Sequence, residues 1–192
     1  MGFVSVLGFA RQLISQRVQS GETVIDGTVG NGVDTVYLAK LVGSRGSVYG
    51  FDIQPQALEQ AKQRLAQELG DTAPSVHLLL QSHEFAAEAV PAGLHGHIGA
   101  AMFNLGYLPG ADHSTITKAK STIPALEACL RLLRKGGIVT VVLYSGHQGG
   151  QAEADSVEAW VSMLPQSDFQ SLRYQFTNQR NHPPYLIAIE KR

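Results

Sequence analysis

The chain has 192 residues, of which 44% are hydrophobic and 16% charged, and its formal net charge is −1. These proportions fit one folded domain over residues 1–192 with a real core, and they exclude a global basic field, so that any RNA contact needs a local patch. The single cysteine, Cys129, excludes a disulfide framework and a multi-cysteine zinc site and favours a reducing cytoplasm.

Strand and helix patterns alternate along the chain. Short apolar or β-branched runs predict strands at residues 23–25, 47–51, 76–80, 98–103 and 138–144. Apolar residues three and four positions apart predict helices at residues 3–18, 33–41, 55–69, 84–90 and 123–133, and another ending over 157–164. The last two apolar runs, 169–176 and 185–190, have no helical pattern between them and read as an antiparallel pair. The alternation predicts an α/β fold with a Rossmann-like, doubly wound, mostly parallel sheet and an antiparallel C-terminal edge.

A glycine-rich turn, Asp26-Gly27-Thr28-Val29-Gly30-Asn31-Gly32, stands between the first predicted strand and the next helix. Glycines allow positive φ and a close approach of the backbone to a ligand, and a helix N-terminus presents unpaired N–H groups. The dinucleotide fingerprint fails because its third glycine is Thr35 here, and no P-loop motif is present. Asp52, which ends the second strand, can accept hydrogen bonds from both ribose hydroxyls. The pattern resembles the class I S-adenosylmethionine-dependent methyltransferases; the alternative is a helix N-terminus without a ligand.

The polar clusters of the sequence all follow strands, and ligands of open α/β sheets bind outside the carboxyl ends of the strands. The clusters are D-G-T-V-G-N-G-V-D-T, F-D-I-Q, S-H-E, F-N-L-G-Y-L-P-G-A-D-H-S and Y-S-G-H-Q-G-G, in this order. Together they resemble the putative rRNA methylase (YtqB-like) family, from Val24 through Pro184. The resemblance implies a methyltransferase that uses S-adenosyl-L-methionine to methylate the exocyclic amine of 5-aminomethyl-2-thiouridine at the wobble position of tRNA.

A cofactor site is expected at the glycine turn and at the ends of the neighbouring strands. Gly30 and Gly32 let the turn pass under the methionine part of the cofactor, Asp26 can reach its ammonium group or an ordered water, and Asp52 would bind the ribose. The expected cofactor-binding residues are Asp26, Thr28, Gly30, Asn31, Gly32, Asp34, Thr35, Asp52, Ile53, Gln54, Ser82, His83, Asn104 and Leu105.

Three of these residues also have alternative roles that need no ligand. Asp34 and Thr35 lie in the first turn of a predicted helix, where they are also favourable without a ligand. His83 is a candidate for a hydrogen bond or stacking on the adenine edge, or else for a capping or surface histidine. His77, His95 and His97 show no motif and no metal-ligand spacing, so no metal is assigned.

An acceptor site is expected after the fourth strand, where Asn104-Leu105-Gly106-Tyr107 resembles the N-P-P-Y motif of methyltransferases that act on exocyclic amines. The Asn104 side chain and the Leu105 carbonyl can hold the amine hydrogens, and Tyr107 can stack on a flipped base or pack against the cofactor pocket. Such a transfer needs mainly alignment and desolvation. The expected catalytic residues are Asn104, Tyr107, Asp112 and His113, the last two for proton removal or substrate orientation. The expected substrate-binding residues are Tyr107, Pro109, Tyr144, His147 and Asn178.

Partners and rival functions complete the expectations. tRNA is the expected substrate, although the scattered lysines and arginines resemble a solvated surface. A homodimer could use residues 169–176 and the apolar N-terminal helix, unless both simply cover the sheet. Residues 1–8 lack a leader pattern and no apolar run spans a bilayer, so we expect a cytoplasmic protein without membrane contact. The alternatives are an rRNA or small-molecule methyltransferase and, from another class, a non-catalytic Rossmann-like binding module.

Overall fold

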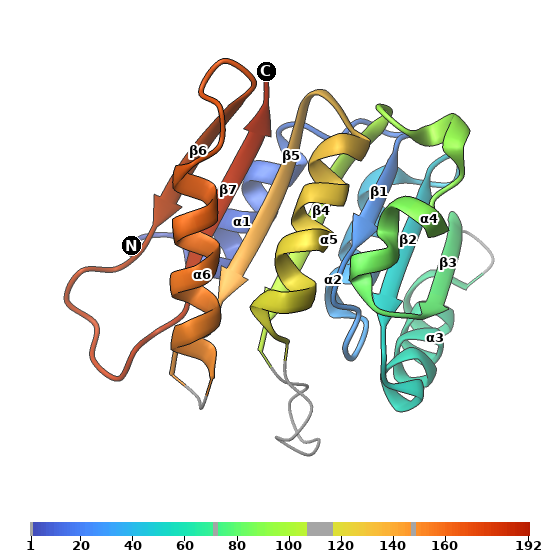
Figure 1. The fold of residues 1–192 in the computed structure, drawn as a ribbon. Helices are drawn as coiled ribbons and strands as arrows, with labels where there is room; N and C mark the ends of the chain where they lie inside the picture. Colours follow the sequence, from blue (N-terminus) through green and yellow to red (C-terminus); the bar gives the residue numbers. More distant parts are fainter. Residues whose placement is uncertain (1, 71–72, 107–116, 147–148) are drawn as a thin grey trace.

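The computed structural model describes residues 2–70, 73–106, 117–146 and 149–192. Within these residues seven strands form one sheet in the order β3-β2-β1-β4-β5-β7-β6, with helices on both faces (Figure 1). The strands are β1 (Thr23–Asp26), β2 (Ser47–Asp52), β3 (Ser75–Leu80), β4 (Ile98–Leu105), β5 (Leu133–Leu143), β6 (Phe169–Tyr174) and β7 (Tyr185–Lys191). The helices are α1 (Val6–Ser15), α2 (Val33–Val42), α3 (Pro55–Leu69), η2 (His83–Phe85), α4 (Ala86–Ala89), η3 (Ala92–Leu94), α5 (Ala119–Leu132) and α6 (Gly150–Ser162).

The pairing of the strands confirms the expected doubly wound sheet. β1 pairs in parallel with β2 and β4, β2 with β3, and β4 with β5. β7 runs antiparallel to both β5 and β6, which makes the C-terminal edge antiparallel as expected. The chain proceeds outward from β1 to β3 and then returns to β4 on the other side of β1. The strand order therefore reverses between β1 and β4, which is where sheets of this kind bind ligands.

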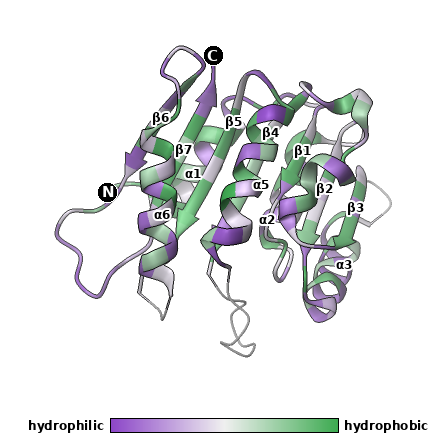
Figure 2. Ribbon diagram, in the orientation of Figure 1, coloured by the Kyte–Doolittle hydropathy of each residue, from purple (hydrophilic) through white to green (hydrophobic). Residues whose placement is uncertain are grey.

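Two cores, one on each face, hold the sheet between its helices. Successive side chains of a strand point to opposite faces, and so Val24 packs with α1 and α2 while its neighbour Ile25 packs with α5 and α6. Because both faces are covered, the central strands are apolar along most of their length, as the green of β5 and β7 in Figure 2 shows. None of the helices seen here is both long and apolar enough to cross a membrane.

Several element boundaries differ from the sequence prediction. The first helix begins at Val6 rather than at residue 3, because the Ser5 hydroxyl oxygen accepts the Gly8 N–H at 3.1 Å and caps the helix. Phe3 therefore lies outside the helix and is 88% exposed. The helix predicted at residues 84–90 is a 3₁₀ turn followed by one short α-helical turn, and β5 starts at Leu133, five residues before the predicted start at Ile138.

Ion pairs join the chain at the amino ends of the central strands. Arg134 Nε lies 2.5 Å from Glu22 Oε1, and Arg134 Nη2 donates to the carbonyl oxygen of Arg17 at 2.8 Å. Arg17 in turn pairs with Glu190 at 2.5 Å. These ion pairs therefore lie at the amino ends of the strands, on the side of the sheet opposite to the carboxyl ends of β1 and β4.

Candidate functional site

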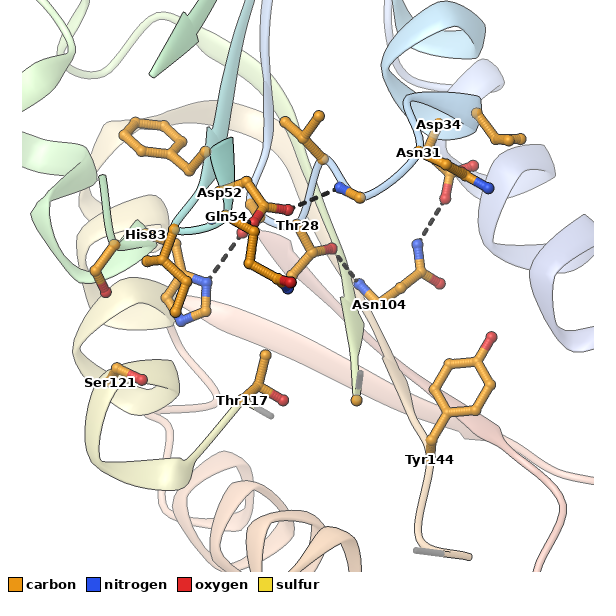
Figure 3. Close-up of a pocket in the computed structure, with 18 of the residues that line it drawn as sticks. Thr28, Asn31, Asp34, Asp52, Gln54, His83, Asn104, Thr117, Ser121 and Tyr144 are labelled. Atoms are coloured by element: carbon orange, nitrogen blue, oxygen red, sulfur yellow. Dashed lines mark hydrogen bonds between the residues drawn. The ribbon is translucent and has the colours of Figure 1, made fainter. Parts of the chain in front are cut away.

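A cavity of about 550 Å³ lies at the carboxyl ends of the central parallel strands. Its walls come from the turn after β1, the ends of β2 and β4, the segment before η2, the start of α5 and one face of α1 (Figure 3). This volume is typical of small-molecule sites. The cavity therefore occupies the place that the strand order marks for a ligand.

Close packing fixes the glycine turn in the cavity wall. A Cβ atom on Gly27 would lie 2.1 Å from the ring of Phe103, which is fully buried. Gly32 precedes α2 with φ 80°, and a Cβ atom there would lie 2.7 Å from the Ala61 Cα atom. Only glycine satisfies these two positions. The turn is consequently held between β4 and α3 in one conformation.

Asp52 ends β2 beside this turn and is held by backbone groups. The Gly30 N–H donates to Asp52 Oδ2 and the Gln54 N–H donates to Asp52 Oδ1, each at 2.9 Å. A carboxylate oxygen has more than one acceptor site. Asp52 can therefore accept further hydrogen bonds from a ligand in the cavity without losing the bonds that fix it.

His83 lines the cavity from η2 in a defined protonation state. Its Nδ1 lies 2.9 Å from the carbonyl oxygen of Gly27, and because a carbonyl only accepts, Nδ1 carries the proton. Burial lowers the pKa of the His83 imidazole, which favours the neutral ring. The other nitrogen, Nε2, is buried and has no hydrogen-bond partner within the described part of the chain. His83 thus offers an acceptor to a bound N–H or O–H group.

Asp26 lies behind the cavity wall and not at its surface. Its Oδ1 accepts the Thr28 N–H at 3.1 Å, and its Oδ2 accepts the Thr35 hydroxyl at 2.6 Å. Burial and the neighbouring Asp34 carboxylate raise the pKa of Asp26 to about 7. The structure therefore gives Asp26 and Thr35 the task of joining the turn to α2. Gly32 and Leu105 also lie outside the cavity lining.

Asn104 stands at the end of β4 in the middle of a side-chain network. Its backbone N–H donates to Thr28 Oγ1 at 2.7 Å, and its Nδ2 donates to Asp34 Oδ2 at 2.6 Å (Figure 3). The other Asp34 oxygen, Oδ1, accepts from Arg11 Nε at 2.9 Å and from Arg11 Nη2 at 2.6 Å. Asn104 Oδ1 is buried and lacks a hydrogen-bond partner among the residues described. An unpaired buried acceptor is costly, so a bound N–H group would be favourable here.

Tyr144 lines the cavity from the segment after β5. Its backbone N–H donates to the Leu105 carbonyl oxygen at 3.3 Å, so this carbonyl already has a partner inside the protein. Burial and the nearby Asp34 carboxylate raise the pKa of the Tyr144 phenol. The side chain is therefore a neutral aromatic ring beside the Asn104 network.

The structure brings together many of the residues that the sequence analysis named. The expected cofactor residues that line the cavity are Thr28, Gly30, Asn31, Asp34, Asp52, Ile53, Gln54, Ser82, His83 and Asn104. Asn178 does not line it and is exposed on the loop between β6 and β7, although His182 of the same loop does. Tyr107, Pro109, Asp112, His113 and His147 lie outside the described residues, so their roles stay predictions.

The expected site residues leave out several residues that line the cavity. They include Leu7, Arg11, Val33, Phe51, Gln81, Thr117, Ser121, Gly146 and His182. Arg11 had a usable signal, because it is an arginine one turn after Leu7 on the helix side that also carries Ile14. An arginine on the packed side of an amphipathic helix needs an acidic or other hydrogen-bond acceptor, and Asp34 is that acceptor here.

Comparisons with known proteins add to this geometry. The family model described as "Putative rRNA methylase" matches residues 48–190. The chloroplastic tRNA (mnm5s2U34)-methyltransferase of Arabidopsis thaliana is 40% identical over 183 residues, which make up 92% of this chain and 66% of that protein. A putative rRNA methylase of Clostridium thermocellum has a crystal structure with 40% identity and a TM-score of 0.93, and the match covers 100% of both chains. A putative methyltransferase of Streptococcus mutans in complex with SAH has 36% identity and a TM-score of 0.87 over 99% of each chain.

The mostly parallel seven-stranded sheet with its antiparallel edge is that of the class I methyltransferase fold. More narrowly, the chain belongs to the putative rRNA methylase family, as the sequence motifs indicate. The chain spans 66% of the length of the Arabidopsis relative.

Proposed function

We propose that this protein is an S-adenosyl-L-methionine-dependent RNA methyltransferase. Its proposed substrate is the exocyclic amine of 5-aminomethyl-2-thiouridine at the wobble position of tRNA. The observation that carries the proposal is the presence, in one cavity, of the backbone-held Asp52 carboxylate and the unpartnered amide oxygen of Asn104. The substrate named for the Arabidopsis relative and the SAH bound by the S. mutans relative support it.

The polar atoms of the cavity fit the proposed cofactor. Its ribose diol and adenine amine are donors, and Asp52 and the buried Nε2 of His83 are acceptors that can receive them. Ile53, which is 57% exposed at the cavity, offers apolar surface for a flat base. The residues proposed to hold the cofactor are Thr28, Gly30, Asn31, Asp52, Ile53, Gln54, Ser82 and His83. Asp26 and Thr35 would support it indirectly by bracing the turn.

The chain's own contribution to transfer would be positioning. When bound, the cofactor supplies an electrophilic methyl group on a sulfonium. The amide oxygen of Asn104 would accept one N–H of the acceptor amine, which turns the nitrogen lone pair away from the amide. No described residue competes for this hydrogen bond, because the oxygen is buried without a partner in the described chain. Alignment and exclusion of water would carry most of the rate, while Asp112 and His113 keep the proposed task of proton removal or substrate orientation.

We further propose that residues 1–192 act as one domain in the cytoplasm. The lone Cys129 is fully buried and unpaired, which suits a reducing compartment. A homodimer would cover the apolar surface around Phe3 and Leu172, which are 88% and 42% exposed. Light scattering of the purified protein tests the dimer: a monomer mass at all concentrations contradicts it.

The substrate assignment is tested on tRNA that carries the aminomethyl precursor. The protein is incubated with this tRNA and S-adenosyl-L-methionine, and the nucleosides are analysed by mass spectrometry. We expect the precursor to be replaced by a nucleoside heavier by one methyl group. Unchanged precursor, with a folded protein that binds S-adenosylhomocysteine (SAH), contradicts the substrate. Label appearing in rRNA or in small amines instead supports the alternatives within the class.

A calorimetric titration separates the enzyme from a non-catalytic binding module. We expect heat of binding when SAH is added to the protein. Absence of binding at millimolar SAH would favour a module that has lost its cofactor site.

A further inference from the structure

Asp34 connects two elements through its side chain instead of capping its own helix. It lies in the first turn of α2, yet its Oδ1 accepts from Arg11 of α1 and its Oδ2 accepts from Asn104 of β4. Its side chain is only 12% exposed, while that of Arg11 is 34% exposed. A residue present merely to favour a helix N-terminus would bond to backbone N–H groups or to water. The contacts of Asp34 instead cross from helix to strand.

The contact with Asp34 decides which end of the Asn104 amide is left without a partner. A side-chain amide has a donor end and an acceptor end, whereas a carboxylate only accepts. The Asp34 carboxylate therefore takes the Nδ2 end, at 2.6 Å, and turns the Oδ1 end away from itself. This Oδ1 is the buried acceptor that has no partner in the described chain. Without the carboxylate, the amide could rotate and present N–H groups, which would repel an amine hydrogen.

Arg11 is itself held in place by contacts with Asp34 and Tyr37. Two of its guanidinium nitrogens, Nε and Nη2, contact the same Asp34 oxygen, and the guanidinium lies 5.2 Å from the centroid of the Tyr37 ring. The Tyr37 hydroxyl donates to the backbone carbonyl of Arg11 at 2.6 Å. The bonds between the Arg11 guanidinium and the Asp34 carboxylate are charge-assisted, and such bonds are short and directional. The orientation of Asn104 is thus determined from α1 through α2.

We propose that Asp34 is a positioning residue for the transfer step. It holds the Asn104 amide with its oxygen available to the acceptor amine, and Arg11 holds Asp34 in place. This inference rests on the proposed function, because it concerns the amine that Asn104 would receive. It assigns Asp34 to the rate of transfer and not to the affinity for the cofactor.

A transposed pair of substitutions tests the proposal. Asp34→Asn keeps the size of the side chain but allows the Asn104 amide to flip, and Asn104→Asp sets two carboxylates against each other. In the double variant D34N/N104D, the amide at position 34 can donate to the carboxylate at position 104 and accept from Arg11. One oxygen at position 104 is then again unpaired. We expect each single variant to lose about 10- to 100-fold in single-turnover rate, with SAH affinity within about threefold of wild type, and the double variant to recover about tenfold.

The matched control is Asp155→Asn, which removes the same charge from an exposed position on α6. It should transfer at the wild-type rate. A wild-type rate in Asp34→Asn overturns the proposal. So does a loss in Asp34→Asn that appears as weaker SAH binding and is not recovered in the double variant, because a merely structural ion pair would behave in that way.

A measurement on the protein without cofactor or RNA tests the orientation itself. The side-chain amide signals of Asn104 are identified in a ¹⁵N–¹H spectrum by their absence from Asn104→Asp. We expect one Nδ2 proton to be shifted downfield by the bond to Asp34 in the wild type and to lose this shift in Asp34→Asn. An unchanged signal overturns the proposal. If the wild type methylates no RNA amine, the proposed function fails, and this spectrum alone decides whether Asp34 orients Asn104.

Discussion

The cavity has two halves that are held in different ways. In the cofactor half (Asp52, Gln54 and His83), the side chains of Asp52 and His83 bond to backbone groups of Gly30, Gln54 and Gly27. In the acceptor half (Arg11, Asp34, Asn104 and Tyr144), Asn104 and Asp34 are oriented chiefly by other side chains from α1 and α2. Both halves need distant segments to meet, since Gly30 and Asp52 are 22 residues apart and Gly27 and His83 are 56 apart, but the partner is backbone in the cofactor half and side chain in the acceptor half. Substitutions in the two halves should therefore have separable effects, on affinity in one and on rate in the other.

The largest effect is expected in the acceptor half. Asn104→Ala removes the proposed acceptor of the amine hydrogen, and loss of one pre-organised hydrogen-bonding group commonly lowers a rate by about 10²- to 10³-fold. SAH affinity should stay within about threefold of wild type, because Asn104 is proposed to face the acceptor. Single-turnover methylation at saturating cofactor measures the rate. A normal rate at saturation, combined with lost cofactor binding, would contradict the division of the cavity.

Asp26, beneath the cofactor half, is expected to make stability depend on pH. Its pKa is raised by burial to about 7, so between its unfolded value and about pH 7 the native state holds a proton that the unfolded state has released. The stability that Asp26 contributes is therefore fully present below the unfolded pKa and is lost as the pH rises through about 7. Each pKa unit is worth about 1.4 kcal/mol.

Asp26→Asn should remove this pH dependence. Relative to the variant, the wild type should lose roughly 2 to 3 kcal/mol of unfolding free energy between about pH 5 and about pH 8. Denaturant unfolding of both proteins at the two pH values gives the difference. Parallel losses in the two proteins would show that Asp26 does not titrate differently on folding.

Asp52→Ala should lower affinity in the cofactor half. It removes the proposed acceptor of the two ribose hydroxyls, and a hydrogen bond to a charged group is worth about 1.5–3 kcal/mol. SAH affinity should therefore fall by about one to two orders of magnitude, while the transfer rate at saturation stays close to wild type. Calorimetry measures the affinity. Asp52→Asn keeps the volume but sets an NH2 donor against the N–H of Gly30 or Gln54, so it should lose affinity as well.

The smallest effect on the cavity is expected from the ion pairs at the amino ends of the strands, which serve as a control for both halves of the cavity. Arg134→Ala removes the partner of Glu22 and should lower the free energy of unfolding by about 1 kcal/mol, as for a partly exposed ion pair. Neither SAH affinity nor transfer rate should change. The exposed pair Lys40–Glu68 offers a comparison, and Lys40→Ala should leave stability unchanged. A change of affinity in Arg134→Ala would mean that the cavity is not independent of the amino ends of the strands.

The two halves also differ in how far the sequence predicts them. The alternation of apolar runs predicts the sheet and its antiparallel edge, and the local spacing of the glycine turn and Asp52 places both after strands, where the structure has them beside the cavity. The placement of Asp26 behind the wall could not be predicted, because it depends on Thr35 reaching back from α2 to take its second oxygen. Arg11 carries a signal as an arginine on an amphipathic helix, but its partner could not be predicted, because Asp34 lies in another element and only the folded chain brings the two together. That His182 and not Asn178 lines the cavity also depends on the folded path of the loop between β6 and β7.

The most direct test of the division into two halves is a single-turnover titration of the double variant D52A/N104A against the two single variants. The affinity for the cofactor should equal that of Asp52→Ala, and the transfer rate at saturation should equal that of Asn104→Ala, because the two side chains act on different steps. If instead Asn104→Ala alone binds cofactor as weakly as Asp52→Ala, with a rate at saturation that matches the wild type, then Asn104 belongs to the cofactor half and the proposed amine site is wrong.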